Sequence, residues 1–341
     1  MKSGLVTIKD IARELNISPS TVSRALKDHP DISTDTKKAV NALAKKLNYQ
    51  PNSIALSLRK SKTNTIGVVI PEIVHFFFST VISGIEDVAY AAGYNVIVSQ
   101  SNESYEREVT DMKALVASRV DGFLVSLSKE TRDFEHLKQI HEKGTPMVFF
   151  DRVCEEINTS KVVIDDYNSA FKATEHLIEQ GCKSIAHMAG PQNLTIGKDR
   201  LEGYIAALKK HQIPVREDLI DRTGSSTVEE GIEQSTRLLN LPAPPDAFFC
   251  NNDMVAIGSM KAIKKKGLRI PDDVAVVGFS DWSVSSLVEP SLTSISQPGY
   301  EMGETAARLF IEQIERGESF IPQTRVLQTQ LTVRESSLRK R

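Results

Sequence analysis

Short hydroxyl side chains and one arginine are concentrated between residues 18 and 24, in the run Ser-Pro-Ser-Thr-Val-Ser-Arg. The hydroxyls of Ser20, Thr21 and Ser23 can donate or accept hydrogen bonds, and Arg24 carries a planar guanidinium with several fixed donors. Such side chains contact the phosphate oxygens and base edges of nucleic acids. The chemistry of this segment therefore favours contact with a nucleic acid.

A short helix is expected to present these side chains. Ser18 can cap its N-terminus, and Pro19 suits the first helical position because no N–H is needed there. Val22, Ala25 and Leu26 then form one narrow apolar face.

An earlier helix is expected to support this one. Thr7 and Asp10 are spaced as a capping pair, and they introduce the apolar stripe Ile8, Ile11, Ala12 and Leu15. Only Asn16-Ile17 separates the two helices, which predicts a helix-turn-helix whose second helix enters a DNA groove. A chance pair of amphipathic helices is the alternative, because this pattern alone is only moderately specific.

Charge is divided unevenly along the chain. Residues 1–60 hold 11 Lys and Arg against 5 Asp and Glu, whereas the remaining residues hold 31 against 39. A basic N-terminal segment followed by an acidic remainder suits phosphate binding by that segment. An ordinary solvated face would give the same composition, so charge only adds to the motif.

The sequence after residue 30 makes the pattern more specific. Ser33 and Thr36 begin a third helix that is expected to extend to Asn48. The chain resembles the lactose-repressor (LacI/GalR) family of bacterial transcription regulators, from about residue 6 to residue 334. The motifs that carry the resemblance are Val6-Thr7-Ile8-Lys9-Asp10-Ile11-Ala12, Ser18 to Arg24, Asn48-Tyr49-x-Pro51-Asn52 and Ala55-x-x-Leu58.

The resemblance implies which residues bind DNA. Ser20, Thr21 and Arg24 match positions on the family's recognition helix that contact bases and phosphates, and Arg24 could pair with a guanine. Pro19 replaces a bulkier polar or aromatic side chain of many relatives, so it can only pack against a base. Other positions match residues with which the family contacts the DNA backbone, namely Ser18, Ser33, Thr36, Tyr49 and Asn52. Thr7 and Ser23 are further candidates for DNA contact.

A hinge helix is implied at about residues 53–60. Leu58 would enter the minor groove as a wedge, one leucine from each subunit, and kink the duplex. Ala55, one turn earlier, is small enough for close approach. Leu58 could instead be an ordinary core leucine. The segment is too short to be a stable helix by itself, so we expect it to order on DNA.

The rest of the chain alternates short apolar strands with helices, which predicts parallel sheets covered on both faces. The strands are expected at 65–71, 95–98, 122–126, 147–150, 161–164, 184–188, 218–221, 247–250, 274–279 and 292–296. The resemblance implies a helix-turn-helix domain at 1–60 and a two-lobed, periplasmic-binding-protein-like α/β core at 61–334. The first lobe is expected at about 62–161 and 294–323, and the second at about 162–293 and 324–334.

The resemblance also implies an effector cleft between the lobes. Arg200 matches the family's ligand-binding arginine, Asn252-Asp253 its Asn-Asp pair, and Asp151-Arg152 two pocket-lining positions. Asn252 could equally be a helix cap.

Two further segments are expected to line this cleft: an aromatic run, and a strand end that departs from the family pattern. In the run His75-Phe76-Phe77-Phe78, His75 and Phe77 are candidates for the ligand-facing surface, with plain packing as the alternative. Many relatives carry two acidic residues where Ser280 and Asp281 stand, so the first carboxylate is missing here. The effector therefore could differ from the familiar sugars. Trp282 could stack on a ligand or simply close the lobe.

Other classes of protein find little support. There is no P-loop, G-x-S-x-G or helical metal pair, and Asp165-Asp166 on a strand would point to opposite faces. The three cysteines, Cys154, Cys182 and Cys250, are widely spaced. We find no secretory signal and no membrane span, which fits a cytoplasmic protein. No cofactor is expected.

The predicted function is a homodimeric transcription regulator, most simply a repressor, that binds double-stranded operator DNA. A small-molecule effector, expected to be a carbohydrate, would control it by favouring one of two states. The alternatives are a periplasmic-type binding protein without a regulatory role and an enzyme acting on the same ligand.

Overall fold

The structure is a computed structural model of the 341-residue chain, and it describes residues 6–49, 62–74, 76–224 and 226–339. The expected sites Asn52, Ala55, Leu58 and His75 therefore lie outside the described residues. The chain divides into two compact units, Met1–Asn64 and Thr65–Arg341, each described here by itself.

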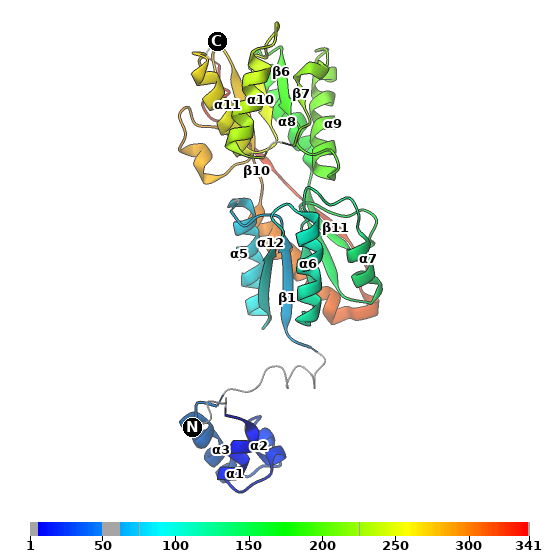
Figure 1. The fold of residues 1–341 in the computed structure, drawn as a ribbon, viewed down its shortest axis with the longest axis vertical. Helices are drawn as coiled ribbons and strands as arrows, with labels where there is room; N and C mark the ends of the chain where they lie inside the picture. Colours follow the sequence, from blue (N-terminus) through cyan, green and yellow to red (C-terminus); the bar gives the residue numbers. More distant parts are fainter. Residues whose placement is uncertain (1–5, 50–61, 75, 225, 340–341) are drawn as a thin grey trace. The chain divides into compact units, whose positions relative to one another are not determined.

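Three helices make up the described part of the first unit: α1 (Ile8–Glu14), α2 (Pro19–Ala25) and α3 (Thr34–Lys46). Their shared core is built on Ile11, Val22 and Val40, which are fully buried. Asn16 adopts a left-handed conformation with φ of 50°, which turns the chain between α1 and α2. The expected helix-turn-helix is confirmed (Figure 1).

The described residues of the second unit form two six-stranded sheets, one in each lobe. The strand order of the first sheet is β11-β5-β4-β3-β1-β2, with the bounds β1 Thr65–Ile70, β2 Asn95–Gln100, β3 Gly122–Val125, β4 Met147–Phe150, β5 Ser160–Ile164 and β11 Thr324–Leu327. The order of the second is β12-β10-β9-β8-β6-β7, with the bounds β6 Ile185–Met188, β7 Ile220–Asp221, β8 Ala247–Cys250, β9 Ala275–Ser280, β10 Thr293–Ser296 and β12 Gln330–Thr332. The described pairings are parallel, except that β12 runs antiparallel to β10.

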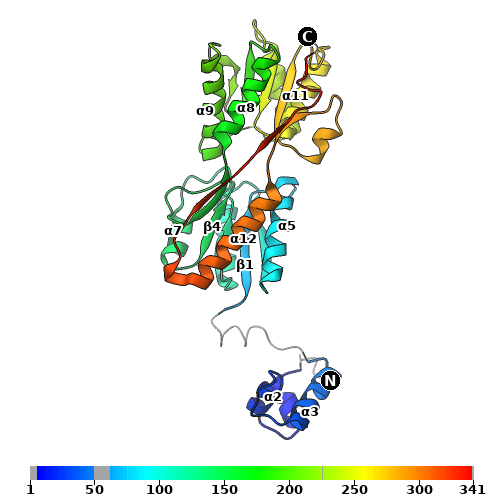
Figure 2. The same ribbon diagram turned by 180° about the vertical axis from the view of Figure 1, so that it is seen from behind.

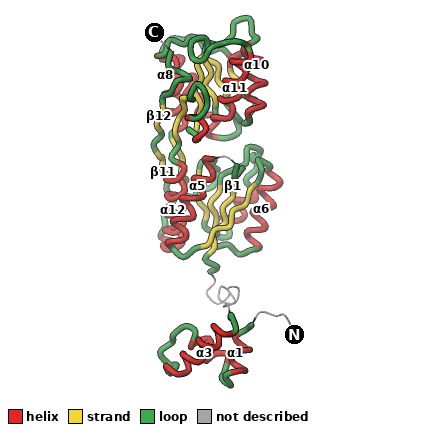
Figure 3. Tube along the Cα trace, turned by 90° about the vertical axis from the view of Figure 1, so that its left-hand side faces the viewer, coloured by secondary structure: helices red, strands yellow, loops and turns green. Residues whose placement is uncertain are grey.

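Helices cover both faces of each sheet, as the strand–helix alternation predicts (Figure 1; Figure 3). Neighbouring residues such as Val68 and Val69 point to opposite faces, Val68 into the core under α5 and α12 and Val69 into the core under α6 and α7. In the second lobe, α8 and α9 pack on one face and α10 and α11 on the other. The helix bounds are α5 Phe76–Ala91, α6 Tyr105–Ala117, α7 Glu135–Glu142, α8 Asp166–Glu179, α9 Thr195–Lys210, α10 Val228–Leu239, α11 Asp253–Lys265 and α12 Gly299–Arg316, with short 3₁₀ turns at Glu217–Leu219, Ser283–Ser286 and Gly317–Ser319.

Glycines let α5 and α12 pack backbone to backbone. A Cβ on Gly84 would lie 2.1 Å from the Tyr300 carbonyl oxygen, and one on Gly303 would lie 2.0 Å from that of Val81. Both positions therefore require glycine, and the close pairing fixes α12 on the first lobe.

The described chain passes between the lobes three times, after β5, after β10 and between β11 and β12 (Figure 2). The expected lobe boundaries were each a few residues too early: 162–164 and 324–327 pair in the first sheet, and 294–296 pair in the second. The cause is that each strand completes its sheet before the chain crosses. The sequence reading also missed β11 and β12 as strands.

Candidate DNA-binding surface and effector pocket

The N-terminus of α2 is organised by its hydroxyl groups. The Ser18 Oγ accepts a hydrogen bond from the Thr21 N–H at 3.1 Å, so Ser18 is the helix cap. The same oxygen lies 2.7 Å from the Ser20 Oγ and 2.8 Å from the Thr21 Oγ1. These hydroxyls are held in one cluster beside Pro19 at the first position of the helix.

The outer face of α2 is polar. Val22 and Ala25 are buried in the core, whereas Pro19, Ser20 and Arg24 are exposed and Ser23 is half-buried. Within the described residues, the Arg24 guanidinium has no hydrogen bond or ion pair. An exposed helix with a free arginine and short hydroxyl side chains can bind phosphates and base edges.

The other expected DNA contacts lie at helix ends of the same unit. The Thr7 N–H and hydroxyl both donate to the Asp10 Oδ2, at 3.0 and 2.6 Å, and the hydroxyl contact is the main reason that the pKa of Asp10 is lowered. Ser33 caps α3 by accepting from the Thr36 N–H at 3.3 Å. Tyr49 packs against the core of the unit.

A pocket lies in the second unit, where loops from both lobes meet. Its empty volume is about 710 Å³, a figure that includes space open to solvent. Its expected members are Phe77, Asp151, Arg152, Arg200, Asn252 and Ser280. Its other lining residues are Phe78, Glu103, Lys129, Pro191, Leu194, Ile196, Gly224, Ser226, Asn251, Trp282 and Gln297.

Asp151 and Arg152 follow β4 and face Glu103. The Arg152 Nη1 donates to both carboxylate oxygens of Glu103, at 2.9 and 2.8 Å. Burial by itself would raise the pKa of Glu103, but the charge and hydrogen bonds of Arg152 outweigh it and hold that pKa below its usual value. Burial raises the pKa of Asp151, whose Oδ2 accepts only a long hydrogen bond, 3.4 Å, from the Ser126 hydroxyl.

Arg200 projects from α9 and is held on three sides. Its Nε donates to the Asp166 Oδ1 at 2.7 Å, its Nη1 donates to the Asn251 carbonyl at 2.8 Å, and its guanidinium lies 3.6 Å from the centre of the Phe279 ring. Burial raises the pKa of Asp166 to about 6, although the charge of Arg200 opposes that rise. Arg200 therefore reaches the pocket in a fixed orientation.

Asn252 is a helix cap, and it also lies at the pocket where an effector contact was predicted. Its side-chain oxygen caps α11 by accepting from the Val255 N–H at 2.9 Å, and the residue also lines the pocket. Ser280 lines the pocket at the end of β9.

Two other expected effector contacts are not among the lining residues. Asp253 is fully buried and accepts from the Ser294 hydroxyl at 2.5 Å and from the Trp282 N–H at 2.7 Å. Asp281 accepts from the Arg334 Nη1 at 2.6 Å. These two carboxylates fix the segment that carries Ser280 and Trp282.

The backbone of the pocket is unusual. Glu103, Asp151 and Ser280 have φ of 60°, 59° and 106°, in the left-handed region that side chains other than glycine rarely adopt. Such conformations cluster at functional sites, because surrounding contacts must hold them in place. Here the Glu103–Arg152 pair is one such contact.

Several pocket residues escaped the sequence reading, chiefly Glu103, Lys129, Asn251 and Trp282, the last of which was left open. Asp166 was judged wrongly as a strand residue. The structure places Asp165 at the cap and Asp166 in the first turn of α8. The Asp165 Oδ1 accepts from the Asn168 N–H at 2.9 Å, a capping signal that the sequence contained.

The described part of the chain shows neither a metal cluster nor a membrane-spanning helix. Among the described residues, no group of three His, Cys, Asp or Glu side chains is placed to hold a metal ion. No helix within the described ranges is long and apolar enough to cross a membrane.

Two family models match the chain. Residues 7–52 match "Bacterial regulatory proteins, lacI family", and residues 63–335 match "Periplasmic binding proteins and sugar binding domain of LacI family". The second match covers more than half of the chain.

Known proteins resemble the chain over nearly its full length. The HTH-type transcriptional repressor CytR of Escherichia coli is 33% identical over 331 residues, which cover 97% of this chain and 96% of CytR. The lac repressor dimer bound to operator and the anti-inducer ONPF has a TM-score of 0.85 and 28% identity, and the match covers 98% of this chain and 100% of that one. The transcriptional regulator CelR in complex with cellobiose has a TM-score of 0.75 and 31% identity, with 97% and 99% covered.

Proposed function

The chain belongs to the LacI family of bacterial regulatory proteins, and from this we propose that it is a cytoplasmic repressor that binds operator DNA as a homodimer. One observation carries the proposal: α2 of the helix-turn-helix buries Val22 and Ala25 and leaves Arg24 exposed without a partner among the described residues. A recognition helix needs that division between a packed face and a polar face.

A dimer suits this DNA-binding unit, because two recognition helices can read the two halves of a pseudo-palindromic operator. The lac repressor structure that resembles this chain is a dimer bound to operator. Exposed apolar side chains on the first lobe support an interface there, since Val74 is 78% and Tyr90 86% exposed. Large apolar side chains left open to water often mark protein contacts.

The pocket supports control by a small polar effector, which we propose is a sugar or sugar derivative. The similar regulator CelR has been solved with cellobiose. Arg200, Asp151 and Asn252 supply fixed donors and acceptors, and Phe77 and Trp282 supply aromatic surface. We propose further that the protein has no catalytic role, since the relatives named above are regulators.

DNA selection tests this function directly. The full-length protein is incubated with random-sequence duplexes, the bound DNA is sequenced, and affinity for the selected site is measured by fluorescence anisotropy at several salt concentrations. We expect a pseudo-palindromic site and an affinity that falls steeply with salt. Arg24→Ala should weaken binding about tenfold to hundredfold and relax specificity at one base pair.

The matched control for that variant is Lys143→Ala, which removes an exposed charge from the end of α7 in the second unit. It should leave DNA affinity unchanged. Failure to select any sequence, or a protein that stays monomeric in sedimentation at working concentration, would contradict the proposal.

A further inference from the structure

Lys129 brings a positive charge to the pocket on a fixed backbone. Its N–H donates to the Glu103 Oε2 at 2.7 Å, and its carbonyl accepts from the Asn193 Nδ2 of the second lobe at 2.8 Å. The side chain lines the pocket, and its ammonium has no hydrogen bond or ion pair with any described residue. Its charge is felt by the carboxylates of Glu103 and Glu230, whose pKa values it helps to lower, but none of the described residues uses its donors. Lys129 therefore brings a cation with unused donors to the pocket on a fixed backbone.

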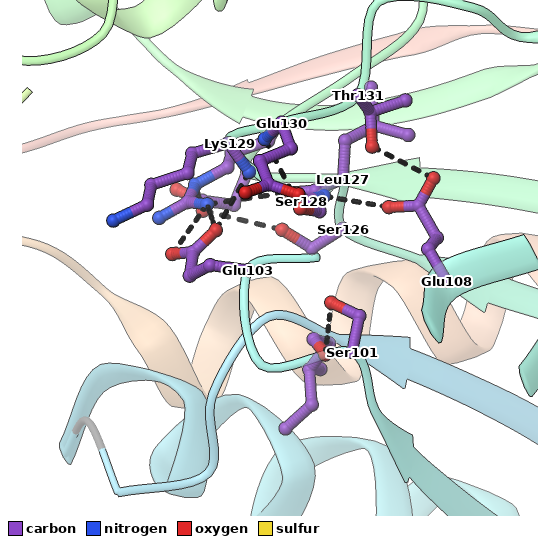
Figure 4. A network of polar contacts seen from close by, with 12 residues as sticks. Ser101, Glu103, Glu108, Ser126, Leu127, Ser128, Lys129, Glu130 and Thr131 are labelled. Atoms are coloured by element: carbon purple, nitrogen blue, oxygen red, sulfur yellow. Dashed lines mark hydrogen bonds and ion pairs between the residues drawn. The ribbon is translucent and has the colours of Figure 1, made fainter. Parts of the chain in front are cut away.

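Buried Glu108 holds the loop that carries Lys129 (Figure 4). The Glu108 carboxylate accepts from the Ser128 N–H at 2.7 Å and from the Thr131 hydroxyl at 3.0 Å. It also lies 3.1 Å from the His136 Nε2. A loop tied down by so many contacts is a rigid support for a binding group, and rigidity improves affinity because little order remains to be imposed.

Arg152 has a donor that no protein group uses. Its Nη1 is engaged by Glu103 and by the Leu127 carbonyl at 3.3 Å. Its Nε is buried and has no hydrogen bond among the described residues, with the Asp151 Oδ2 at 3.8 Å. A buried donor without an acceptor is unfavourable unless a ligand supplies one.

Acceptors in the pocket are fewer than donors. The Glu103 carboxylate is occupied by Arg152 and the Lys129 N–H, and Asp166 is occupied by Arg200. Ser280 supplies a hydroxyl, so Asp151 is the one lining carboxylate of the described residues with weakly used oxygens. The lining residues contain three cations, Lys129, Arg152 and Arg200, against the two carboxylates Glu103 and Asp151.

We propose that the effector is an anionic sugar derivative, a sugar acid or a sugar phosphate, whose anionic group binds Lys129 and the free Nε side of Arg152. Its hydroxyls then donate to Asp151. An anion would satisfy both unused donors with charge-assisted hydrogen bonds, which are about twice as strong as neutral ones. The inference rests on the proposed function, because it assumes that the effector occupies this pocket.

The test compares each neutral sugar with its own acid and phosphate. The full-length protein is screened by thermal shift and then calorimetry with galactose, galacturonate and galactose 6-phosphate, with the glucose series, and with ribose, ribonate and ribose 5-phosphate. At least one acid or phosphate should bind at least about tenfold more tightly than its neutral parent. Comparison of the acid with the phosphate identifies which anionic group the pocket takes.

Variants connect that preference to Lys129. Lys129→Gln should weaken the anionic ligand about tenfold to hundredfold, because a hydrogen bond to a charged group is lost, and it should leave the neutral parent nearly unaffected. Lys129→Arg should retain most of the affinity. Lys143→Gln, an exposed lysine at the end of α7, should change nothing.

The inference is overturned if no acid or phosphate binds in a manner that depends on Lys129, whether or not a neutral sugar binds. That outcome leaves the proposed repressor function intact, because DNA selection tests it without any effector. Failure of DNA selection with anion binding preserved would be the reverse result, and it would support the pocket chemistry alone.

Discussion

Replacement of Arg200 by methionine tests the central contact of the pocket. Arg200 and Asp166 are 6% and 5% exposed, and they are joined by a 2.7 Å hydrogen bond between the Arg200 Nε and the Asp166 Oδ1. Methionine keeps much of the length of the side chain but removes the charge, so Asp166 loses its partner while it remains buried. The Asn251 carbonyl also loses its donor.

The expected magnitude follows from this burial. Removing one partner of a buried ion pair destabilises a protein by about 3–5 kcal/mol, which corresponds to about 10 °C in Tm for a unit of this size. The effect should be smaller at pH 5 than at pH 8. Because the pKa of Asp166 is raised to about 6, its carboxyl is mostly protonated at pH 5 and then needs no cation.

Urea unfolding followed by tryptophan fluorescence measures this effect in the second unit alone, because Trp282 is the only tryptophan of the chain. The free energy of unfolding is compared for wild type, Arg200→Met, Asp166→Asn and the double variant. The double variant should recover part of the loss, since the unpaired charge is gone. Arg308→Met is the control, because Arg308 forms an exposed pair with Glu304 that contributes at most about 1 kcal/mol.

Two results would refute this reasoning. One is a loss below about 1 kcal/mol for Arg200→Met at pH 8, which would mean that Asp166 is solvated or neutral without its partner. The other is strict additivity in the double variant, which would mean that the two side chains do not act as a pair.

Three further predictions address other parts of the chain. Leu58→Ala should weaken operator binding strongly with the fold intact, and unchanged operator affinity in the anisotropy assay would remove its role as a minor-groove wedge. Burial raises the pKa of Asp253 from 3.8 to about 7, so the folded state binds this proton more tightly than the unfolded chain. The free energy of unfolding therefore falls as pH rises between those two values, by about 4 kcal/mol in total. Asp253→Asn should remove that part of the slope, and urea titrations at pH 5 and pH 8 that show the same slope in the variant would disprove it. Asn193→Ala should weaken effector binding about threefold to tenfold, because Asn193 Nδ2 joins the lobes through the Lys129 and Thr131 carbonyls, and calorimetry that shows equal affinity would exclude that role.

The sequence was sufficient for features with local causes. Caps such as Ser18 and Ser33 are followed at once by helices, and strands such as β1, β3 and β8 are short apolar runs. The expected α/β architecture and the helix-turn-helix are accordingly confirmed. β11 was missed because most of its residues are exposed, so no apolar alternation marks it.

The pocket could be predicted only where a residue lies at a recognisable strand or helix end. Asp151 and Asn252 have such positions, and both line the pocket. Lys129 has no local signal, since its placement depends on Glu103 and Asn193, which are 26 and 64 residues away. Asp253 lies beside the site but is not among its lining residues, because its carboxylate accepts from the Trp282 N–H, and its contact with an effector stays a prediction.

The late position of α12 in the chain has a consequence for biosynthesis. This helix buries Met302, Ala306 and Phe310 against a sheet whose strands β1 to β5 leave the ribosome much earlier. Until residue 316 has emerged, one apolar wall of the nascent first lobe lacks its cover. A premature stop before residue 299 should therefore release a helix-turn-helix domain joined to an incompletely folded first lobe with exposed apolar surface. Proteases and chaperones should bind such a product, and it should not act as a smaller regulator.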